Sequence, residues 1–308
     1  MIQPNFFIAG AVRSGTTAMY TYLDEHLKVF MGRPKDGNFF SEDFDGLRTV
    51  TTWADYNRMF KDAQPEHRAV GEASALYLHS DVACAAIREY RPGAKIIVLL
   101  REPARLVESL HAQMYYTGDE DEVDFEAAWR LQEERAEGGR IPPRCRAPKQ
   151  LQYRQMGMLG QHVERLLDVF PREQIHIALF DDFRKTPRQV YENVLKFLDV
   201  PSDNRTDFPV INPRKRHKRR SVANVTEQPP SALRWAARWA KRIVPVKEFG
   251  LLDWIRRRNV SGYEPKPLRA EFKRELRAAF EEDTRRLANL IGRDLSHWLR
   301  EQNTMEDK

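Results

Sequence analysis

The stretch Asn5–Leu27, NFFIAGAVRSGTTAMYTYLDEHL, sets a short apolar run directly before a glycine-containing turn and a segment that can form a helix. A strand that enters such a turn and continues as a helix presents backbone N–H groups and the positive end of the helix to an anion. The turn, GAVRSGTT at Gly10–Thr17, therefore has the outline of a phosphate-binding loop. Thr16 stands where the GxxxxGK(S/T) loop of ATP- and GTP-hydrolysing proteins has its lysine. The expected ligand is an anion that is held without that lysine.

The side chains of this loop suit a phosphate or sulfate group. Ser14, Thr16 and Thr17 offer hydroxyl donors, and Gly15 completes the turn before the helix. Arg13 adds a planar charged fork that can hold two oxygens at once. The alternative is that the glycines only serve the geometry of a strand-to-helix turn.

Short continuous apolar runs predict buried parallel strands, because they lack the alternation of a half-exposed strand. They are 6–9, 95–100 (KIIVLL) and 175–180 (IHIALF). Apolar residues at helical spacing predict helices within 159–170, 190–198 and 268–290. The alternation of strands and helices indicates an α/β fold of three layers, in which helices flank a central, mainly parallel sheet. Ligands of such folds bind beyond the carboxyl ends of the strands.

A second anion-binding element follows the strand at 95–100. The chain continues as REPARLVESLH, which places Arg101 at the carboxyl end of the strand and Ser109 eight residues later on the next helix. Two donors at that place can hold a second phosphate. A second anion-binding element therefore supports the prediction that the loop at Gly10–Thr17 binds an anion.

The composition predicts one globular domain spanning 1–308. With 41% hydrophobic and 31% charged residues, the chain can bury one large core, and no linker divides it. The polar segments 118–150 and 201–230, which contain Pro and Gly, are expected to be long loops or lids.

Positive charge is concentrated in one region of the chain. There are 51 Lys and Arg against 45 Asp and Glu, and fourteen of the cations but only three of the acids fall within 212–258. This lid-like basic region is expected to face a polyanionic ligand, substrate or surface. The alternative is a solvated basic face.

Cysteine usage and the N-terminal sequence favour a soluble protein of the cytoplasm. The two cysteines, Cys84 and Cys145, are too few for a disulfide framework and give no metal-ligand spacing. The stretch MIQPNFFIAGAV lacks a basic region, and its apolar part is shorter than that of a signal peptide. No apolar run reaches membrane-spanning length.

The two anion-binding elements resemble those of the sulfotransferases that use 3′-phosphoadenosine 5′-phosphosulfate (PAPS). In that family an RSGTT-like loop binds the 5′-phosphosulfate, and an arginine followed eight positions later by a serine binds the 3′-phosphate. The resemblance implies that Arg13–Thr17 hold the 5′ end of PAPS and that Arg101 and Ser109 hold its 3′-phosphate. The resemblance also implies that no magnesium or other metal ion is needed. Because such a loop transfers a sulfuryl group and does not hydrolyse a nucleotide, the resemblance implies no lysine at Thr16 either.

The resemblance covers most of the chain, because five further elements follow in the family's order. They are HLKVFMGRPKDGNFF (26–40), VGEASALYL (70–78), GMLGQHVERLLDVFPREQIHIALFDDF (157–183), VYENVLKFLDV (190–200) and LIGRDLSHW (290–298). The last three resemble the bacterial branch of the carbohydrate-type sulfotransferases.

Sulfuryl transfer to a hydroxyl needs a base for the acceptor's proton. The family's base is a glutamate in a KEPHFF-like segment, and Asp36 in PKDGNFF occupies its place. Aspartate is one methylene shorter, and an aspartate before Gly37 is also typical of a turn. Glu72 in the GEAS segment is the second candidate base, with a structural carboxylate as the alternative.

The leaving 5′-phosphate needs a cation, and Arg13 stands where carbohydrate sulfotransferases of this type often have a lysine. An arginine can hold the charge but does not donate its proton, so Arg13 is expected to act electrostatically. Lys35 can assist, and Ala73 replaces a further lysine of the family. His79 and His111 are reserve bases, because lone histidines are more often structural.

The basic run NPRKRHKRR (212–220) resembles in position the family's late loop that closes over the nucleotide, so Lys215 and Arg216 are predicted to contact the 3′-phosphate. A solvated basic turn is the alternative. No nucleic-acid motif accompanies the run, and no nucleic-acid partner is expected. Trp53 can stack on adenine or pack in the core. The segment 231–244 predicts a helix packed on the core, with a lid or a peripheral contact to an anionic membrane as alternatives.

The sequence thus predicts an enzyme that transfers the sulfuryl group of PAPS to an acceptor hydroxyl. A carbohydrate or glycolipid acceptor rests on the resemblance alone, and a small metabolite is the alternative. Two other classes of protein remain. A small-molecule kinase would need a loop lysine and a metal-binding acid. A non-catalytic polyanion-binding protein would explain the basic region but not the paired phosphate elements.

Overall fold

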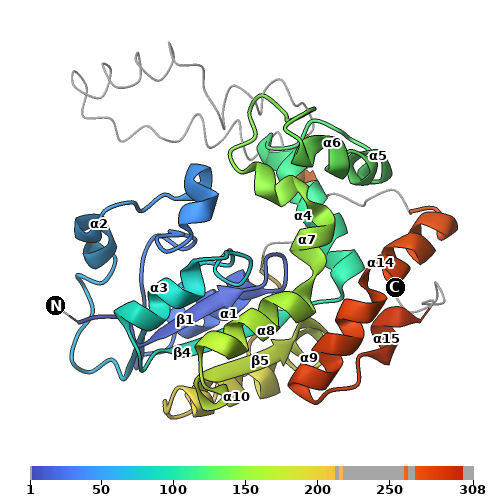
Figure 1. The fold of residues 1–308 in the computed structure, drawn as a ribbon. Coiled ribbons are helices and arrows are strands. Elements are labelled where there is room, and N and C mark those ends of the chain that lie inside the picture. The colour runs from blue at the N-terminus through green and yellow to red at the C-terminus, as the bar shows by residue number, and fades with distance from the viewer. Residues whose placement is uncertain (1, 212–214, 218–259, 263–267, 301–308) are drawn as a thin grey trace, which may run out of the picture.

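The structure, a computed structural model, describes residues 2–211, 215–217, 260–262 and 268–300. Figure 1 shows a central sheet with helices on both of its faces. The five strands of the sheet are β1 (Phe6–Gly10), β2 (Val29–Met31), β3 (Ala69–Ala73), β4 (Lys95–Leu100) and β5 (Ile175–Leu179). Their order across the sheet is β2-β3-β1-β4-β5, and every neighbouring pair is parallel.

The helices form two layers, one on each face of the sheet. Successive side chains of a strand point to opposite faces, so Phe6 and Ile8 pack in one apolar cluster and Phe7 and Ala9 in the other. The first cluster is covered by α1 (Thr16–Asp24), α9 (Phe180–Lys185) and α10 (Pro187–Phe197). The second is covered mainly by α3 (Ala83–Tyr90), α4 (Pro103–Thr117), α8 (Leu159–Val169) and α14 (Ala270–Ile291).

Shorter helices complete the described part of the chain. The α-helices among them are α2 (Trp53–Arg58), α5 (Phe125–Arg130), α6 (Gln132–Ala136), α7 (Tyr153–Gly157) and α15 (Ser296–Leu299). The 3-10 helices are η1 (Glu42–Leu47), η2 (Pro148–Leu151) and η3 (Arg172–Gln174).

The predicted α/β fold is confirmed. The three apolar runs are β1, β4 and β5, and the three helical stripes are α8, α10 and α14. The segment 118–150 differs from the prediction of a long loop, because it contains α5 and α6. Asp124 begins α5, where its side chain accepts a hydrogen bond from the amide of Ala127.

The order of the strands places two loops side by side. The chain leaves β1 toward β2 and β3 on one side of the sheet and later fills the other side with β4 and β5. Because β1 and β4 are parallel neighbours, the loop after β1 and the residues after β4 meet at the same edge. This is the point at which open α/β sheets bind ligands.

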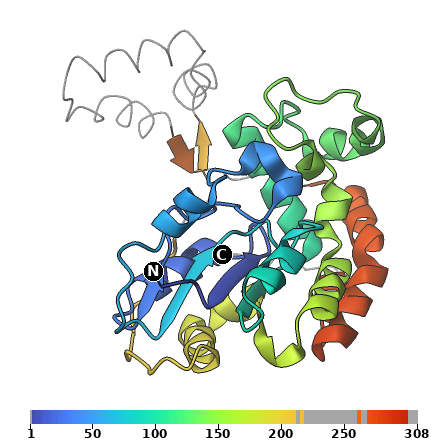
Figure 2. The same ribbon diagram turned by 60° about the vertical axis from the view of Figure 1, so that its left-hand side comes forward.

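A second, two-stranded sheet pairs β6 (Lys215–His217) with β7 (Val260–Gly262) in antiparallel fashion. Figure 2 shows this pair apart from the central sheet, and the backbone of β6 lies close to α4. The rest of the basic region 212–258, including the helix predicted at 231–244, lies outside the described residues.

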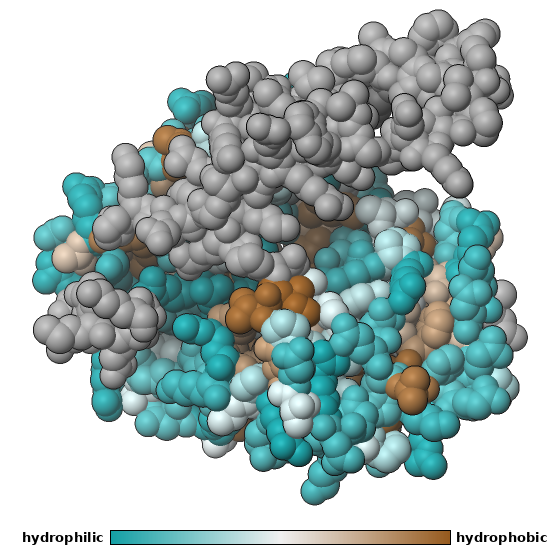
Figure 3. Space-filling model, turned by 180° about the vertical axis from the view of Figure 1, so that it is seen from behind, coloured by the Kyte–Doolittle hydropathy of each residue, from teal (hydrophilic) through white to brown (hydrophobic). Residues whose placement is uncertain are grey.

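The described surface is mainly polar. In Figure 3 hydrophobic residues form small separate patches on the visible face. Among the residues that the structure describes, the large apolar side chains that are exposed are Leu27, Trp53, Val82, Val123 and Val210. Within the described ranges, no helix combines the length and the apolar character needed to cross a bilayer.

Candidate active site

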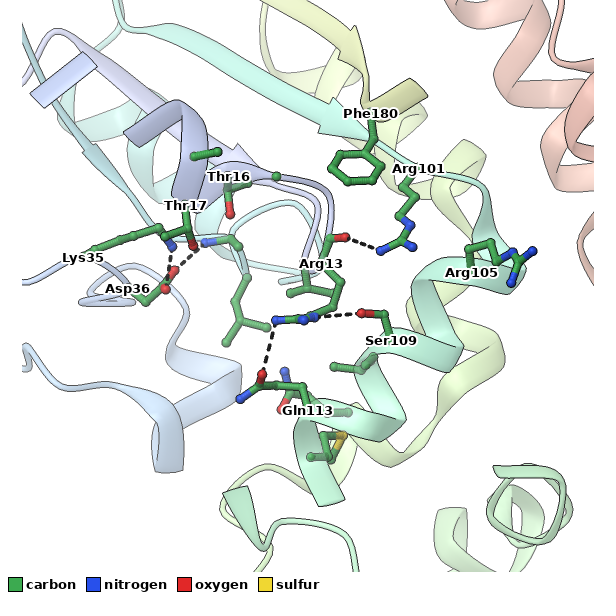
Figure 4. Close-up of a pocket in the computed structure, with 18 of the residues that line it drawn as sticks. Arg13, Thr16, Thr17, Lys35, Asp36, Arg101, Arg105, Ser109, Gln113 and Phe180 are labelled. Atoms are coloured by element: carbon green, nitrogen blue, oxygen red, sulfur yellow. Dashed lines mark hydrogen bonds and ion pairs between the residues drawn. The ribbon is translucent and has the colours of Figure 1, made fainter. Parts of the chain in front are cut away.

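A cavity of about 840 Å³ lies at the edge of the sheet where the loops after β1 and β4 meet. It brings together eight of the residues predicted from the sequence. They are Arg13, Gly15, Thr16, Thr17, Lys35, Asp36, Arg101 and Ser109. Segments that are about a hundred residues apart in the chain thus line one space, as Figure 4 shows.

The turn before α1 requires glycine at Gly15, whose φ of 92° is left-handed. A Cβ atom there would also lie 3.1 Å from the rings of Phe180 and Phe183. Ser14 is buried, and its hydroxyl donates to the carbonyl of Val12 (3.2 Å), so this side chain shapes the loop instead of lining the cavity.

Arg13 connects the loop to α4. Its Nε donates to the hydroxyl of Ser109 (3.0 Å) and its Nη1 to the side-chain oxygen of Gln113 (3.2 Å). Arg101 in turn donates to the carbonyl oxygen of Arg13 (3.0 Å). The residues predicted for the two ends of the nucleotide are therefore in direct contact (Figure 4).

The end of the cavity beside Arg101 has features that the sequence analysis missed. The Arg101 guanidinium lies 4.9 Å from the centre of the Phe180 ring, and Val210 and Ile211 line the same cavity. Burial raises the pKa of Glu102, which also lines it, to about 7. This carboxyl is thus partly protonated near neutral pH, which reduces its repulsion of a bound anion.

Asp36 is both a turn residue and a cavity residue. Its φ of 57° is left-handed, a conformation that aspartate tolerates better than most residues. The amide of Ala75 donates to one carboxylate oxygen (3.2 Å), and Lys35 Nζ lies 2.6 Å from the other (Figure 4). The carboxylate is therefore oriented from two sides at the cavity wall.

Glu72 is enclosed and does not line the cavity. The hydroxyls of Tyr56 (3.0 Å), Tyr77 (2.9 Å) and Ser74 (3.3 Å) donate to its carboxylate. The Ser74 hydroxyl oxygen also accepts from the amide of Asn38 (3.0 Å). The position of Glu72 suits support of the turn at Asn38, whereas Asp36 is better placed to reach a molecule in the cavity.

Replacement of Glu72 by glutamine should make stability less dependent on pH. Burial raises the pKa of Glu72 to about 7, above the value of an unfolded glutamate. The folded chain therefore retains a proton that the unfolded chain releases, and the wild-type protein loses stability as pH rises from about 4.5 to 7. A neutral side chain of the same size should reduce that loss.

Urea unfolding of both proteins at about pH 5, 6, 7 and 8 measures this difference. Glu66→Gln, at an exposed position, is the matched control and should follow the wild-type pH dependence. Identical pH dependence in Glu72→Gln and the wild-type protein would contradict the prediction.

The two reserve histidines lie outside the cavity lining. His79 is buried behind the phosphate-binding loop, where its Nε2 accepts from the amide of Val12 (3.2 Å). Burial holds the pKa of His79 well below its ordinary value, so the ring stays neutral. His111 Nε2 donates to the carbonyl of Glu122 (2.9 Å), and burial lowers its pKa as well. Both side chains are placed to support structure.

The other predicted contacts fall elsewhere. Trp53 packs edge-on against Phe39, with 4.7 Å between the ring centres, and does not line the cavity. Lys215 and Arg216 belong to β6, but their side chains lie outside the described part of the structure. Among the described residues, no cluster of His, Cys, Asp and Glu side chains could hold a metal ion.

The fold and the cavity define an α/β protein with a phosphate-binding loop and a second anion-binding element beside it. Residues 3–228 match the sulfotransferase domain, so this chain belongs to the sulfotransferase family. The predicted family is confirmed, and the general reaction that the family supports is sulfuryl transfer.

A solved structure and curated relatives agree with this family. A sulfotransferase from Alicyclobacillus acidocaldarius is 27% identical with a TM-score of 0.71, covering 97% of this chain and 100% of that one. The human bifunctional heparan sulfate N-deacetylase/N-sulfotransferase 3 is 29% identical over 204 residues, which are 64% of this chain and 22% of that protein. The Drosophila melanogaster bifunctional heparan sulfate N-deacetylase/N-sulfotransferase is 24% identical over 212 residues, 64% of this chain and 20% of that protein. The chain thus spans about a fifth of the length of these curated relatives.

Proposed function

We propose that this protein transfers the sulfuryl group of PAPS to a hydroxyl of a carbohydrate or glycolipid acceptor and releases adenosine 3′,5′-bisphosphate. The observation that carries the proposal is the meeting of two anion-binding elements in one cavity through the contacts of Arg13 with Ser109 and Arg101. A ligand with one anionic group would need only one of them.

Different residues of the cavity suit the phosphosulfate, the 3′-phosphate and the adenine of PAPS. The amides of the loop and the hydroxyls of Thr16 and Thr17 suit the 5′-phosphosulfate. Arg101 and Ser109 suit the 3′-phosphate. The ring of Phe180 offers an aromatic surface for adenine.

Transfer would proceed by attack of the acceptor oxygen on sulfur as the bond between sulfur and the bridging phosphate oxygen breaks. Asp36 would accept the proton of the acceptor hydroxyl. Arg13 and the loop amides would stabilise the charge on the leaving phosphate. Every step uses groups that line the cavity or face it from the loop.

The chemical class of the acceptor is proposed from the names of the curated relatives. The curated relatives carry the name of heparan sulfate N-sulfotransferase, which supports a glycan acceptor for this chain. That name also makes an amino group of a sugar the alternative to a hydroxyl. A small metabolite is the remaining alternative.

Calorimetric titration without metal tests the donor site. We expect adenosine 3′,5′-bisphosphate to bind with about micromolar affinity, which corresponds to roughly 8 kcal/mol, and much more tightly than ATP or 5′-AMP. Arg101→Ala should lose this preference because it removes the contact to the 3′-phosphate. Arg91→Ala, which removes an exposed arginine outside the cavity, should keep it.

The alternatives give different results. Equal binding of 5′-AMP and the bisphosphate would contradict the assignment of the 3′-phosphate site. Magnesium-dependent turnover of ATP would favour a kinase. Heparin binding that falls steeply with salt and ignores the bisphosphate would favour a non-catalytic polyanion-binding protein.

A further inference from the structure

One face of α4 runs along the cavity and gives it two ends. Arg105, Ser109, Gln113 and Thr117 follow at four-residue spacing, and all four line the cavity. Figure 4 shows the first three in order along the helix. The beginning of α4 adjoins Arg101, whereas its end lies about 21 Å further on, at a rise of about 1.5 Å per residue. The residues proposed for the donor extend from Arg101 to the contact between Arg13 and Gln113. The part of the cavity beyond Gln113 is left for the acceptor.

The second end is walled by residues 118–152, here named the helical lobe, which contains α5 and α6 (Figure 1). Three of its side chains line the cavity: Asp119, Arg146 and Gln150. None of the three belongs to the motifs that the sequence analysis assigned to the donor or to the base.

Gln150 is the clearest sign of a ligand at this end. The residue is only 8% exposed, and it lines the cavity. Its carboxamide makes no hydrogen bond to any residue that the structure describes. The Gln150 amide atoms are not among the fully enclosed polar atoms without a partner, so the amide is open to the cavity, where it can donate to and accept from a bound molecule.

Arg146, which lines the cavity with Gln150, is oriented by Asp119. Asp119 accepts from the backbone amide of Arg146 (3.0 Å), from its Nε (2.9 Å) and from its Nη2 (2.5 Å). The Asp119 side chain is only 4% exposed, whereas 46% of the Arg146 side chain is exposed. The carboxylate therefore anchors the guanidinium while the guanidinium reaches the cavity.

A buried ion pair fixes the helical lobe that carries these groups. Arg135 donates to both oxygens of Glu120 (2.7 Å each), and neither side chain is exposed. The hydroxyl of Tyr153 donates to the same carboxylate (2.6 Å). Recognition groups on a rigid support discriminate better than groups on a mobile one, because less ordering accompanies binding.

We propose that Gln150 and Arg146 bind the ring hydroxyls of a sugar acceptor and thereby orient its reacting group toward Asp36. Leu47, Leu76 and Met114 line the same cavity, so amide and charged groups stand beside an apolar surface. A sugar ring matches this mixture, because its hydroxyls both donate and accept while its C–H face is apolar. The inference rests on the proposed function and adds the residues that select the acceptor.

Saccharide binding to the protein saturated with adenosine 3′,5′-bisphosphate tests the inference. The probes are a neutral N-acetylglucosamine disaccharide, an unsulfated oligosaccharide that contains uronic acid, phenol and a straight-chain alcohol. Gln150→Ala should weaken binding of a saccharide about three- to tenfold, the effect of losing one or two neutral hydrogen bonds. Gln155→Ala, at an exposed position outside the cavity, is the matched control and should have no effect.

Arg146→Ala, with exposed Arg144→Ala as its control, should weaken a saccharide about tenfold. A greater loss for the uronic acid probe would identify an anionic sugar as the acceptor, and equal losses would identify a neutral one. Affinity for the bisphosphate should stay within about twofold in all four variants, and thermal melting checks that they fold.

Saccharide binding that is unchanged in both Gln150→Ala and Arg146→Ala would overturn the inference. Binding of phenol or the alcohol, but of no saccharide, would overturn it as well. Failure of the wild-type protein to bind the bisphosphate would instead remove the proposed function on which the inference rests.

Discussion

Replacement of Asp36 by asparagine should lower kcat by a factor of roughly 10²–10⁴, the usual contribution of a positioned general base. Asparagine keeps the shape of the side chain and can still accept the hydrogen bond from the amide of Ala75, but it cannot take up the acceptor's proton. Both residues also tolerate the left-handed backbone found at this position. The bisphosphate should therefore bind about as well as to the wild-type protein, which calorimetry can check beside a steady-state assay of sulfate transfer.

Two further variants sharpen this experiment. Asp62→Asn, at an exposed position outside the cavity, should leave kcat unchanged. Asp36→Glu restores the residue of the family's motif, but glutamate is less tolerant of a φ of 57°. It should therefore recover part of the activity and lose some stability. Wild-type turnover by Asp36→Asn would show that another group is the base.

Replacement of Arg13 by alanine should lower kcat by about 10²–10³, the effect of removing one donor that stabilises developing charge. The guanidinium contacts Ser109 and Gln113 on α4, so it stands between the loop and the serine predicted for the 3′-phosphate. Arg13→Lys keeps the charge but not the planar fork, and should lose less activity than Arg13→Ala.

The split between kcat and affinity decides the role of Arg13. A fall in kcat with little change in affinity for the bisphosphate would assign Arg13 to the leaving group. A comparable loss of affinity with unchanged kcat would make it only a binding residue. Arg91→Ala serves again as the control, because its side chain is exposed and outside the cavity.

The fold was largely predictable because its strands are buried on both faces. The runs at 95–100 and 175–180 contain almost no polar residues, and the structure places them as β4 and β5. Strand β2 was not predicted, since three residues are too few to show a period. Helices α5 and α6 were also missed, because each is short and the surrounding sequence is rich in charge.

The part of the cavity formed by the phosphate-binding loop and Arg101 was predictable from local sequence, and the part formed by Gln150 and Arg146 was not. Arg101 follows β4 directly, and Arg13 lies in the loop that leaves the neighbouring strand β1, so the topology brings them together. Gln150 and Arg146 reach the cavity through the packing of the helical lobe, which no local pattern encodes. Phe180 had a weaker signal, because it begins the helix that follows β5 at the same edge of the sheet.

The backbone is left-handed at three cavity residues, Arg13, Asp36 and Asn38, with φ of 59°, 57° and 53°. At these positions a gain in folding stability would conflict with the function of the site. Glycine adopts such angles freely, whereas arginine loses roughly 1–2 kcal/mol there and aspartate and asparagine lose less. An engineer who seeks heat resistance would therefore find glycine attractive at these three sites. Each exchange would delete a side chain that borders or supports the cavity. Substitutions that stabilise this protein should therefore be sought on its outer helices, away from the left-handed residues of the cavity.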